Sequence, residues 1–146
     1  MTELLTHDAA ELAEDARRLL AELDRDVPGA DSAAGECRPP IDVVETATTV
    51  EVVVDVPGVP AEALRVAIRR NSVLVVGVKL ATLAGPASRY HLAERSYGRF
   101  ARVIRLAGAA DAGRARAVVE GGRLRVVLPR LDDRRGRVYA VPVERA

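Results

Sequence analysis

Aromatic residues and cysteine are scarce in this chain: its 146 residues include one phenylalanine, three tyrosines, no tryptophan and one cysteine. So few rings provide neither a stacking platform for nucleic-acid bases nor an aromatic cage for a cationic ligand. The lone Cys37 cannot close a disulfide within the chain, which fits a reducing compartment. No base stands beside it in the sequence, so we interpret Cys37 as an incidental thiol.

The chain also lacks an excess of one charge and any long apolar run. Its 22 basic and 21 acidic residues give a net charge of +1, which provides no general attraction to nucleic acids or membranes. No apolar run approaches the roughly 20 residues of a membrane span, and the N-terminus carries Glu3 instead of a basic cluster before a hydrophobic stretch. Asp132 and Asp133 partly neutralise the arginines of residues 130–137, which favours a solvated tether over a phosphate-binding segment. We therefore expect a cytoplasmic protein with no nucleic-acid partner and no stable membrane insertion.

Catalytic and cofactor-binding patterns are absent as well. His7 and His91 have no second histidine or cysteine at metal-ligand spacing. The phosphate-cradling pattern Gly-x4-Gly-Lys-Ser/Thr does not occur, and Lys79, the only lysine, lies in a predicted strand. The sequence therefore predicts no catalytic residue, no cofactor, no metal site and no enzymatic activity.

The chain begins with a helical pattern over residues 1–27. Leucines recur at helical spacing, charged residues take the other side, and Pro28-Gly29 ends the pattern. This amphipathic helix either docks on its own domain or forms an arm whose leucines contact other protein chains. A polar linker over residues 30–40 separates it from the rest of the chain, which favours the arm. The leucine stripe predicted for such contacts consists of Leu4, Leu5, Leu12, Leu19, Leu20 and Leu23.

After Pro40 the apolar residues change to a period of two, which is typical of half-buried strands. Turn signals such as Pro57-Gly58 and Asn71-Ser72 recur roughly every ten residues, and Gly121-Gly122 indicates a two-residue hairpin. Roughly seven or eight short strands with such turns predict an all-β sandwich. The expected strands cover residues 50–56, 64–69, 73–79, 98–106, 114–120 and 123–128.

One predicted strand carries an unexpected arginine. Phe100, Arg102 and Ile104 share one face of strand 98–106, so a guanidinium lies within an apolar face. An arginine keeps its proton, and a partly buried one needs a carboxylate. Glu94 is a nearby candidate for that carboxylate, and the alternative is a solvated arginine at a sheet edge.

The run Tyr90-His-x-x-Glu-Arg-Ser-x-Gly-x-Phe-x-Arg-x-x-x-Leu106 resembles the centre of the α-crystallin domain of small heat-shock proteins of the bacterial type. Other pieces of the family pattern occur in the same order, from about residue 39 to residue 143. They are the opening strand 40–45, the turn 55–59, the late hairpin with Ala117, Gly122 and Leu124, the closing Leu128-Pro129, and the C-terminal Val141-Pro142-Val143.

The resemblance implies an all-β fold, the immunoglobulin-like β-sandwich of the α-crystallin domain, with an N-terminal amphipathic helical arm and a flexible C-terminal extension. The corresponding parts of this chain are the arm and linker over residues 1–38, the sandwich over residues 39–130 and the extension over residues 131–146. Within the extension, the charged residues 130–140 are expected to form a mobile tether.

The resemblance also implies contacts between copies of the chain. In bacterial and plant members a strand on a long loop pairs with the partner subunit, and residues 88–95 are its counterpart here. An edge strand on a loop satisfies its backbone by pairing, and a second chain can supply the pair. Glu94 and Arg102 would then meet across the interface. The predicted dimer-interface residues are Tyr90, His91, Leu92, Glu94, Arg95 and Arg102.

The segment Val141-Pro142-Val143, which we call the anchor, resembles the family's C-terminal docking motif. In an extended chain its two valines point the same way, and its proline stiffens the backbone. The resemblance implies docking into a groove of a neighbouring subunit. The alternative is a last strand of the chain's own sheet, which the central proline and the charged tether disfavour. The predicted groove residues are Val66, Ile68, Ala117 and Val119.

The function implied by the resemblance is that of an ATP-independent chaperone, a holdase that binds unfolding proteins and prevents their aggregation. Its expected partners are itself, as a homodimer and larger homo-oligomer, and unfolding client proteins, which the leucine stripe would contact. The alternative is a non-oligomeric co-chaperone or adaptor with the same sandwich. An enzyme or small-ligand sandwich would need a polar pocket that the sequence does not indicate.

Overall fold

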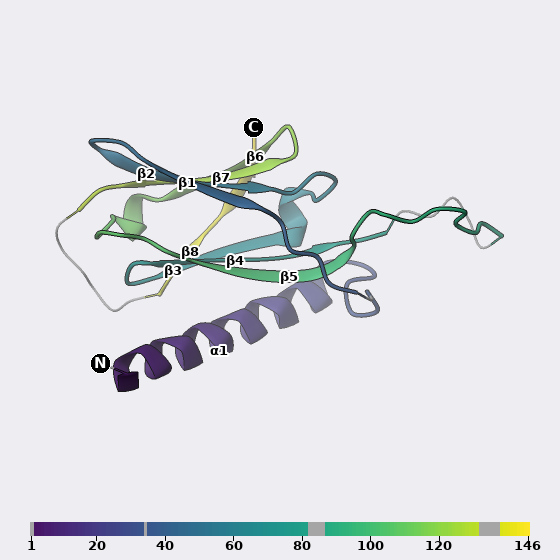
Figure 1. Ribbon diagram of the computed structural model, residues 1–146, viewed down its shortest axis with the longest axis horizontal. Helices are drawn as coiled ribbons and strands as arrows, with labels where there is room; N and C mark the ends of the chain where they lie inside the picture. The colour runs from purple at the N-terminus through teal and green to yellow at the C-terminus, as the bar shows by residue number, and fades with distance from the viewer. Residues whose placement is uncertain (1, 34, 82–86, 132–137) are drawn as a thin grey trace.

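The computed structural model describes residues 2–33, 35–81, 87–131 and 138–146, with the backbone alone for residues 2–8. Two β-sheets are stacked face to face, and one helix lies across the outer face of the lower sheet (Figure 1). The elements in chain order are α1 (Thr2–Asp26), β1 (Ile41–Glu45), β2 (Thr49–Asp55), the 3-10 helix η1 (Ala61–Ala63), β3 (Leu64–Arg69), β4 (Ser72–Lys79), β5 (Gly98–Arg105), the 3-10 helix η2 (Ala112–Arg114), β6 (Arg116–Glu120), β7 (Arg123–Pro129), β8 (Val138–Val141) and β9 (Val143–Arg145).

The upper sheet has the strand order β1-β2-β7-β6-β9 and the lower sheet the order β5-β4-β3-β8. All pairs are antiparallel except β6 with β9. The predicted all-β sandwich with an N-terminal helix is confirmed. Its two sheets leave β1 and β9 at the borders of one sheet, and β5 and β8 at the borders of the other.

The core between the sheets is built from the inward-facing residues of the alternating strands. Val52 of β2 pairs with Val126 of β7, and both are fully buried. Strands β6 and β7 are joined through Gly121 and Gly122, whose φ angles of 59° and 76° suit the two-residue hairpin that their sequence predicts. Alternation in the sequence thus found these strands because one face of each is buried and the other is not.

Strand β4 departs from alternation because both of its faces are covered. Every residue from Ser72 to Val78 is buried. Val73 and Val75 point into the sandwich, whereas Leu74 and Val76 pack against α1. A strand covered on both faces reads as a continuous apolar run, and residues 73–78 have that composition.

Two segments differ from their sequence-based predictions. Residues 88–95 form no strand in the described part of the chain. The predicted tether extends to Ala140, but Val138 already begins β8, because this segment pairs with β3 at the border of the lower sheet. Residues 132–137 of the tether lie outside the described residues.

Candidate interaction surfaces

The anchor occupies the border where the two sheets meet. Strand β8 runs antiparallel to β3 and sets Val141 opposite Val66, while β9 runs parallel to β6 and sets Val143 opposite Ala117. Val141 is buried, Val143 is half-buried and the intervening Pro142 is exposed. The remaining groove residues lie alongside, with Ile68 opposite Tyr139 and Val119 opposite Arg145. The structure therefore brings the anchor and the groove residues together within one chain.

Docking within the same chain differs from the expected docking on a neighbour. The anchor is tethered to its own groove through the segment after β7, and tethering gives it a high effective concentration there. Pro142 does not prevent strand pairing because it falls between β8 and β9, where the chain passes from one sheet to the other and no ladder N–H is required. A central proline is therefore compatible with strands of the same sandwich on either side of it.

The anchor contact is small. Its two valines contribute on the order of 3–6 kcal/mol of gross apolar burial. Ordering the backbone of the short strands β8 and β9 opposes this gain. Pairing partners at the rim, such as Arg145 with Glu62 and Arg116 with Glu144, are exposed and contribute little. The contact is therefore suited to opening and closing.

Residues 87–97, the described part of the loop that leads into β5, project away from both sheets (Figure 1). The predicted interface residues Tyr90, His91, Leu92, Glu94 and Arg95 are all exposed, with 54% exposure for Tyr90 and 75% for Leu92. At the base of the loop, the Arg95 guanidinium lies 5.0 Å from the centroid of the Tyr97 ring. Residues 88–96 are exposed and irregular, and they have no strand partner among the described residues.

Strand β1 is the border of the upper sheet and pairs only with β2. Its residues are mostly exposed, including Val43 and Val44, each about half exposed. A border strand with unpaired backbone groups and exposed valines is a ready template for another strand. The described structure thus contains an exposed segment without a partner and a strand edge without a partner.

Arg102 lies on the apolar face of β5 between Phe100 and Ile104, as the alternation predicts. Within the described residues it forms no ion pair, and its Nη1 donates a hydrogen bond to the carbonyl oxygen of Pro39. Burial, and then the nearby charge of Arg38, lower the pKa of the Arg102 guanidinium from its usual value. No contact between Glu94 and Arg102 occurs among the described residues of this chain.

The leucine stripe of α1 faces its own domain. Leu12, Leu19 and Leu23 are buried and Leu20 is half-buried, while the side chains of Leu4 and Leu5 lie outside the described residues. Leu19 and Leu23 pack on the outer face of the lower sheet against Ala67, Leu74 and Val76. The docked helix, one of the two alternatives that the sequence leaves open, is therefore the arrangement in this structure.

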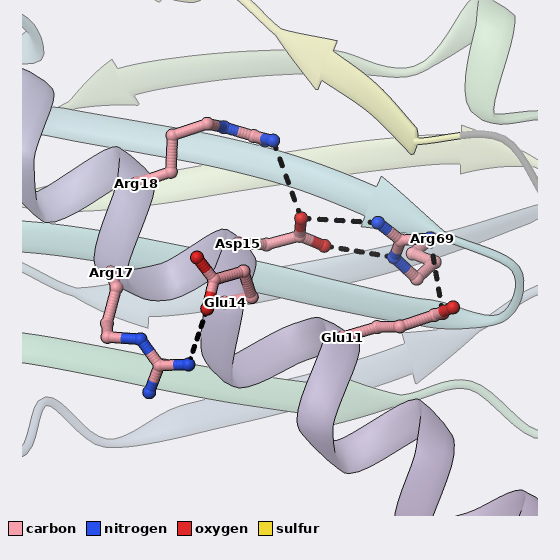
Figure 2. Close-up of polar contacts among 6 residues, drawn as sticks. All are labelled: Glu11, Glu14, Asp15, Arg17, Arg18 and Arg69. Carbon is pink, nitrogen blue, oxygen red and sulfur yellow. Dashed lines mark hydrogen bonds and ion pairs between the residues drawn. The ribbon is translucent and has the colours of Figure 1, made fainter.

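Ion pairs accompany the apolar contacts of α1 (Figure 2). The Asp15 carboxylate accepts two hydrogen bonds from Arg69, at 2.9 Å from Nε and 3.2 Å from Nη2. Glu11 Oε2 lies 3.2 Å from Nη1 of the same arginine. Asp15 is only 3% exposed, although the helical pattern predicts it on the solvent side. The missed signal is that Glu11, Asp15, Glu22 and Asp26 accompany the leucines at helical spacing.

Cys37 is half-buried, and its Sγ lies 3.5 Å from the Gly98 carbonyl oxygen. Burial raises the pKa of this thiol, which the charge of Lys79 partly offsets. A thiol with a raised pKa is a poor nucleophile at neutral pH. Across the described ranges, no three or more His, Cys, Asp or Glu residues are grouped so as to hold a metal ion. None of the described helices is both long and apolar enough to span a bilayer.

The profile of the Hsp20/alpha crystallin family matches residues 42–144, from β1 to β9. The chain belongs to this family. This places the chain among the small heat-shock proteins. The matched residues contain both borders of the sandwich, the projecting loop and the anchor, whereas α1 lies before them.

Curated relatives agree with this assignment. The small heat-shock protein is 33% identical to heat shock protein 16 of Schizosaccharomyces pombe over 100 residues, covering 67% of this chain and 70% of the relative. It is 31% identical to the 18.9 kDa heat shock protein of Oryza sativa subsp. japonica over 104 residues, and 40% identical to the 23.2 kDa heat shock protein of the same plant over 91 residues. These matches cover 70% and 59% of this chain but only 59% and 42% of the rice proteins.

Solved structures show the same architecture. Heat shock protein 16.0 from S. pombe superposes with a TM-score of 0.61 at 30% identity, covering 70% of this chain and 94% of that one. A small heat-shock protein from Xylella fastidiosa gives a TM-score of 0.59 at 23% identity, covering 69% and 93%, and this likeness is one of fold. The curated relatives named above are eukaryotic, so the bacterial type of this protein stays a prediction.

Proposed function

We propose that this small heat-shock protein is an ATP-independent holdase of the cytoplasm, which assembles through dimers and binds unfolding proteins before they aggregate. The observation that carries the proposal is the incomplete border of the sandwich. One border strand, β1, has an unpaired edge, and a projecting loop with exposed Tyr90 and Leu92 has no strand partner among the described residues. Binding an unfolded chain lowers no chemical barrier, so the activity requires apolar surface and no catalytic residue.

The proposed dimer forms when residues 88–95 of each copy pair with the β1 edge of the other. Pairing would satisfy the backbone groups of both segments and cover part of the exposed apolar surface of the loop and of β1, which includes Tyr90, Leu92, Val43 and Val44. Glu94 of one copy would then supply the carboxylate that Arg102 of the other copy lacks among its described contacts. This arrangement accounts for the exposed valines of β1 and for the position of Arg102 at once.

The proposed larger oligomer forms by exchange of the anchor. The groove between β3 and β6 makes the same contacts with an anchor from its own chain or from a neighbour, so exchange changes the partner and not the contact. A single anchor is weak, and several in one assembly hold through effective concentration. Heating would open anchors and expose grooves to unfolding clients.

A monomeric adaptor is the second candidate, and one observation favours it. The anchor fills the groove of its own chain, which leaves that border of the sandwich closed without a neighbour. An adaptor would stay monomeric at all working concentrations, whereas the holdase would form dimers and larger species. Native mass separates the two candidates directly.

The function is tested by light scattering from a heat-labile client protein with and without the full-length small heat-shock protein. We expect suppressed scattering near one subunit per client, equal in the presence and absence of ATP. Unchanged aggregation at that ratio would sink the holdase proposal. A dependence on ATP hydrolysis would also contradict it, because no nucleotide-binding pattern exists in the sequence.

A further inference from the structure

The outer face of the lower sheet is apolar at its centre. Ala67 of β3 and Leu74 and Val76 of β4 are at most 2% exposed, and α1 covers them. Val138 of β8 packs against the same cluster. These four residues, which we call the helix seat, lie on the side of the sheet that faces away from the sandwich core. The sandwich therefore has a second apolar surface, separate from its core and from the anchor groove.

Arginines surround the helix seat, and each contacts an acidic residue of α1. Arg69 binds Asp15 and Glu11 at one end, where Arg70 Nη1 also lies 3.1 Å from Glu11 Oε2. Farther along, Arg65 lies 2.9 Å from Asp26 and 3.5 Å from Glu22, and Arg99 of β5 lies 2.6 Å from Asp24. The four arginines come from the sandwich, and the five carboxylates come from the helix.

The complementarity of charge is most specific at Asp15. Its carboxylate is buried, and Arg69 donates to both of its oxygens in the fork geometry that a planar guanidinium offers to a carboxylate (Figure 2). An occupant without a carboxylate at this point would leave a partly buried guanidinium without one of its partners. The helix seat and its arginines therefore distinguish acidic amphipathic segments from neutral ones.

The helix that fills the seat is easier to displace than a strand of the sandwich. It makes no hydrogen-bonded ladder with the sheet, and it is joined to β1 only through the linker after Asp26. Most of its ion pairs lie at the rim, where solvent weakens them. Elements with few buried contacts open at a lower cost than the core.

We propose that the helix seat is a client-binding site for amphipathic segments that carry carboxylates beside their apolar residues, and that α1 is the internal occupant that such segments displace. The inference rests on the proposed holdase function and names the class of client segment that this surface selects. The occupant already present shows the required chemistry, with apolar residues at the centre and carboxylates opposite the four arginines. Heating would favour displacement by loosening α1 before the sandwich.

The test uses the full-length protein and a fluorescent peptide with the sequence of residues 9–27, whose binding is measured by anisotropy. A second peptide keeps the apolar residues but replaces the carboxylates that face the arginines, and we call it the neutral peptide because those positions are uncharged, although its remaining arginines give it a net positive charge. A control peptide carries only Glu14→Gln, because Glu14 pairs with Arg17 of its own helix at the exposed surface. The neutral peptide carries Glu11→Gln, Asp15→Asn, Glu22→Gln, Asp24→Asn and Asp26→Asn.

We expect the acidic peptide and the Glu14→Gln control to bind equally, and the neutral peptide to bind at least about tenfold more weakly. A full-length variant with Glu11→Gln and Asp15→Asn weakens its own helix but leaves the seat intact. It should bind the acidic peptide about tenfold more tightly than the wild type does, because the internal competitor is weaker. Equal affinities of the acidic and neutral peptides for either chain would overturn the inference.

A second full-length variant, Arg65→Gln with Arg99→Gln, removes two of the four arginines around the helix seat and should weaken the preference for the acidic peptide over the neutral one. It should bind the acidic and neutral peptides with affinities that differ by less than about threefold. If this variant does not fold, binding of the three peptides to the wild type is measured at rising temperature instead. Dissociation constants for the acidic and neutral peptides that stay equal at every temperature would contradict the site.

Failure of this inference is distinguishable from failure of the holdase. If the protein suppresses client aggregation but the acidic peptide does not compete with the client, the helix seat is not the client site and the holdase remains. If no client is protected while the acidic peptide still binds selectively, the seat holds its helix by the stated chemistry but the proposed function is wrong. Selective binding together with competition supports both.

Discussion

The two ends of this small heat-shock protein are docked on its sandwich, whereas the middle loop is not. The N-terminal helix covers the outer face of the lower sheet, and the C-terminal strands fill the groove between β3 and β6. The loop over residues 87–96 is held at both ends by strands β4 and β5 and projects into solvent (Figure 1). An end tethered on one side can fold back onto its own domain, while a loop that projects away from its own sheets leaves its backbone available to another chain.

The proposed function gives the three segments different roles. In that proposal the docked ends are displaced and so regulate which apolar surfaces of the domain are open. The loop and the β1 edge have no partners among the described residues, and we propose that their contacts determine whether dimers form. Variants that change only one docked end or only the loop test this division of roles most directly.

The largest effect is expected at the C-terminal end. Val141→Ala with Val143→Ala removes apolar groups from the groove and should weaken anchor docking by about 2–4 kcal/mol. If the anchor also joins subunits, the assembly shrinks on size-exclusion chromatography. Val127→Ala is the matched control, because it removes the same atoms from a half-buried position of β7 outside the groove. If the double variant elutes at the same volume as the wild type, the anchor does not join subunits.

A somewhat smaller effect is expected at the N-terminal end. Asp15→Asn leaves Arg69 partly buried without its two charged contacts to that carboxylate, which should weaken helix docking by about 2–3 kcal/mol. Hydrogen exchange should then accelerate in α1 and stay slow in β2 and β7, whose backbone does not contact the helix. Glu14→Gln, at the exposed face of α1, should leave exchange unchanged. Equal protection of α1 in both variants would show that the buried pair does not hold the helix.

At the loop, the expected effect is on association and not on folding. Leu92→Ser changes a side chain that is 75% exposed, so the free energy of unfolding should change by less than about 0.5 kcal/mol. The dimer should nevertheless dissociate at higher protein concentration, which sedimentation measures. Leu131→Ser provides a control at another exposed leucine. If the Leu92→Ser variant has the same dimer dissociation constant as the wild type, the loop does not govern association.

The smallest effect concerns an exposed pair on the upper sheet, which contacts neither the docked ends nor the loop. A hydrogen bond from Arg125 lowers the pKa of the Glu51 carboxyl, although burial opposes the shift. The charged form is therefore favoured in the folded state, and its contribution is complete above the ordinary pKa of a glutamate and lost as the pH falls through the lowered pKa. Glu51→Gln should be slightly less stable than wild type at neutral pH and equally stable in acid, as measured by denaturant unfolding at each pH. A difference that grows in acid would contradict the sign.

The strands were predictable because burial on one face imposes a period of two on the sequence. That signal placed β2, β6 and β7 and the hairpin at Gly121-Gly122. Strand β4 lost the alternation because α1 covers its outer face. The family resemblance, carried by ordered motifs from about residue 39 to residue 143, implied the immunoglobulin-like sandwich that periodicity alone does not specify.

What the sequence did not reveal depends on contacts between distant segments. The helical pattern predicts Asp15 on the solvent side, because its partner Arg69 is 54 residues away in the sequence. Pro142 read as an obstacle to strand pairing because nothing in the sequence marks the point where the chain changes sheets. Whether the anchor prefers its own groove or a neighbour's depends on effective concentration, which the residue pattern does not specify.

The most direct test of the account is a native mass spectrum of the full-length protein at two temperatures. Because the sandwich has a strand edge and a loop without partners among the described residues, the account predicts dimers and larger even-numbered assemblies at low temperature, with smaller species increasing on warming. A single-chain mass at both temperatures would contradict it and identify the monomeric adaptor instead.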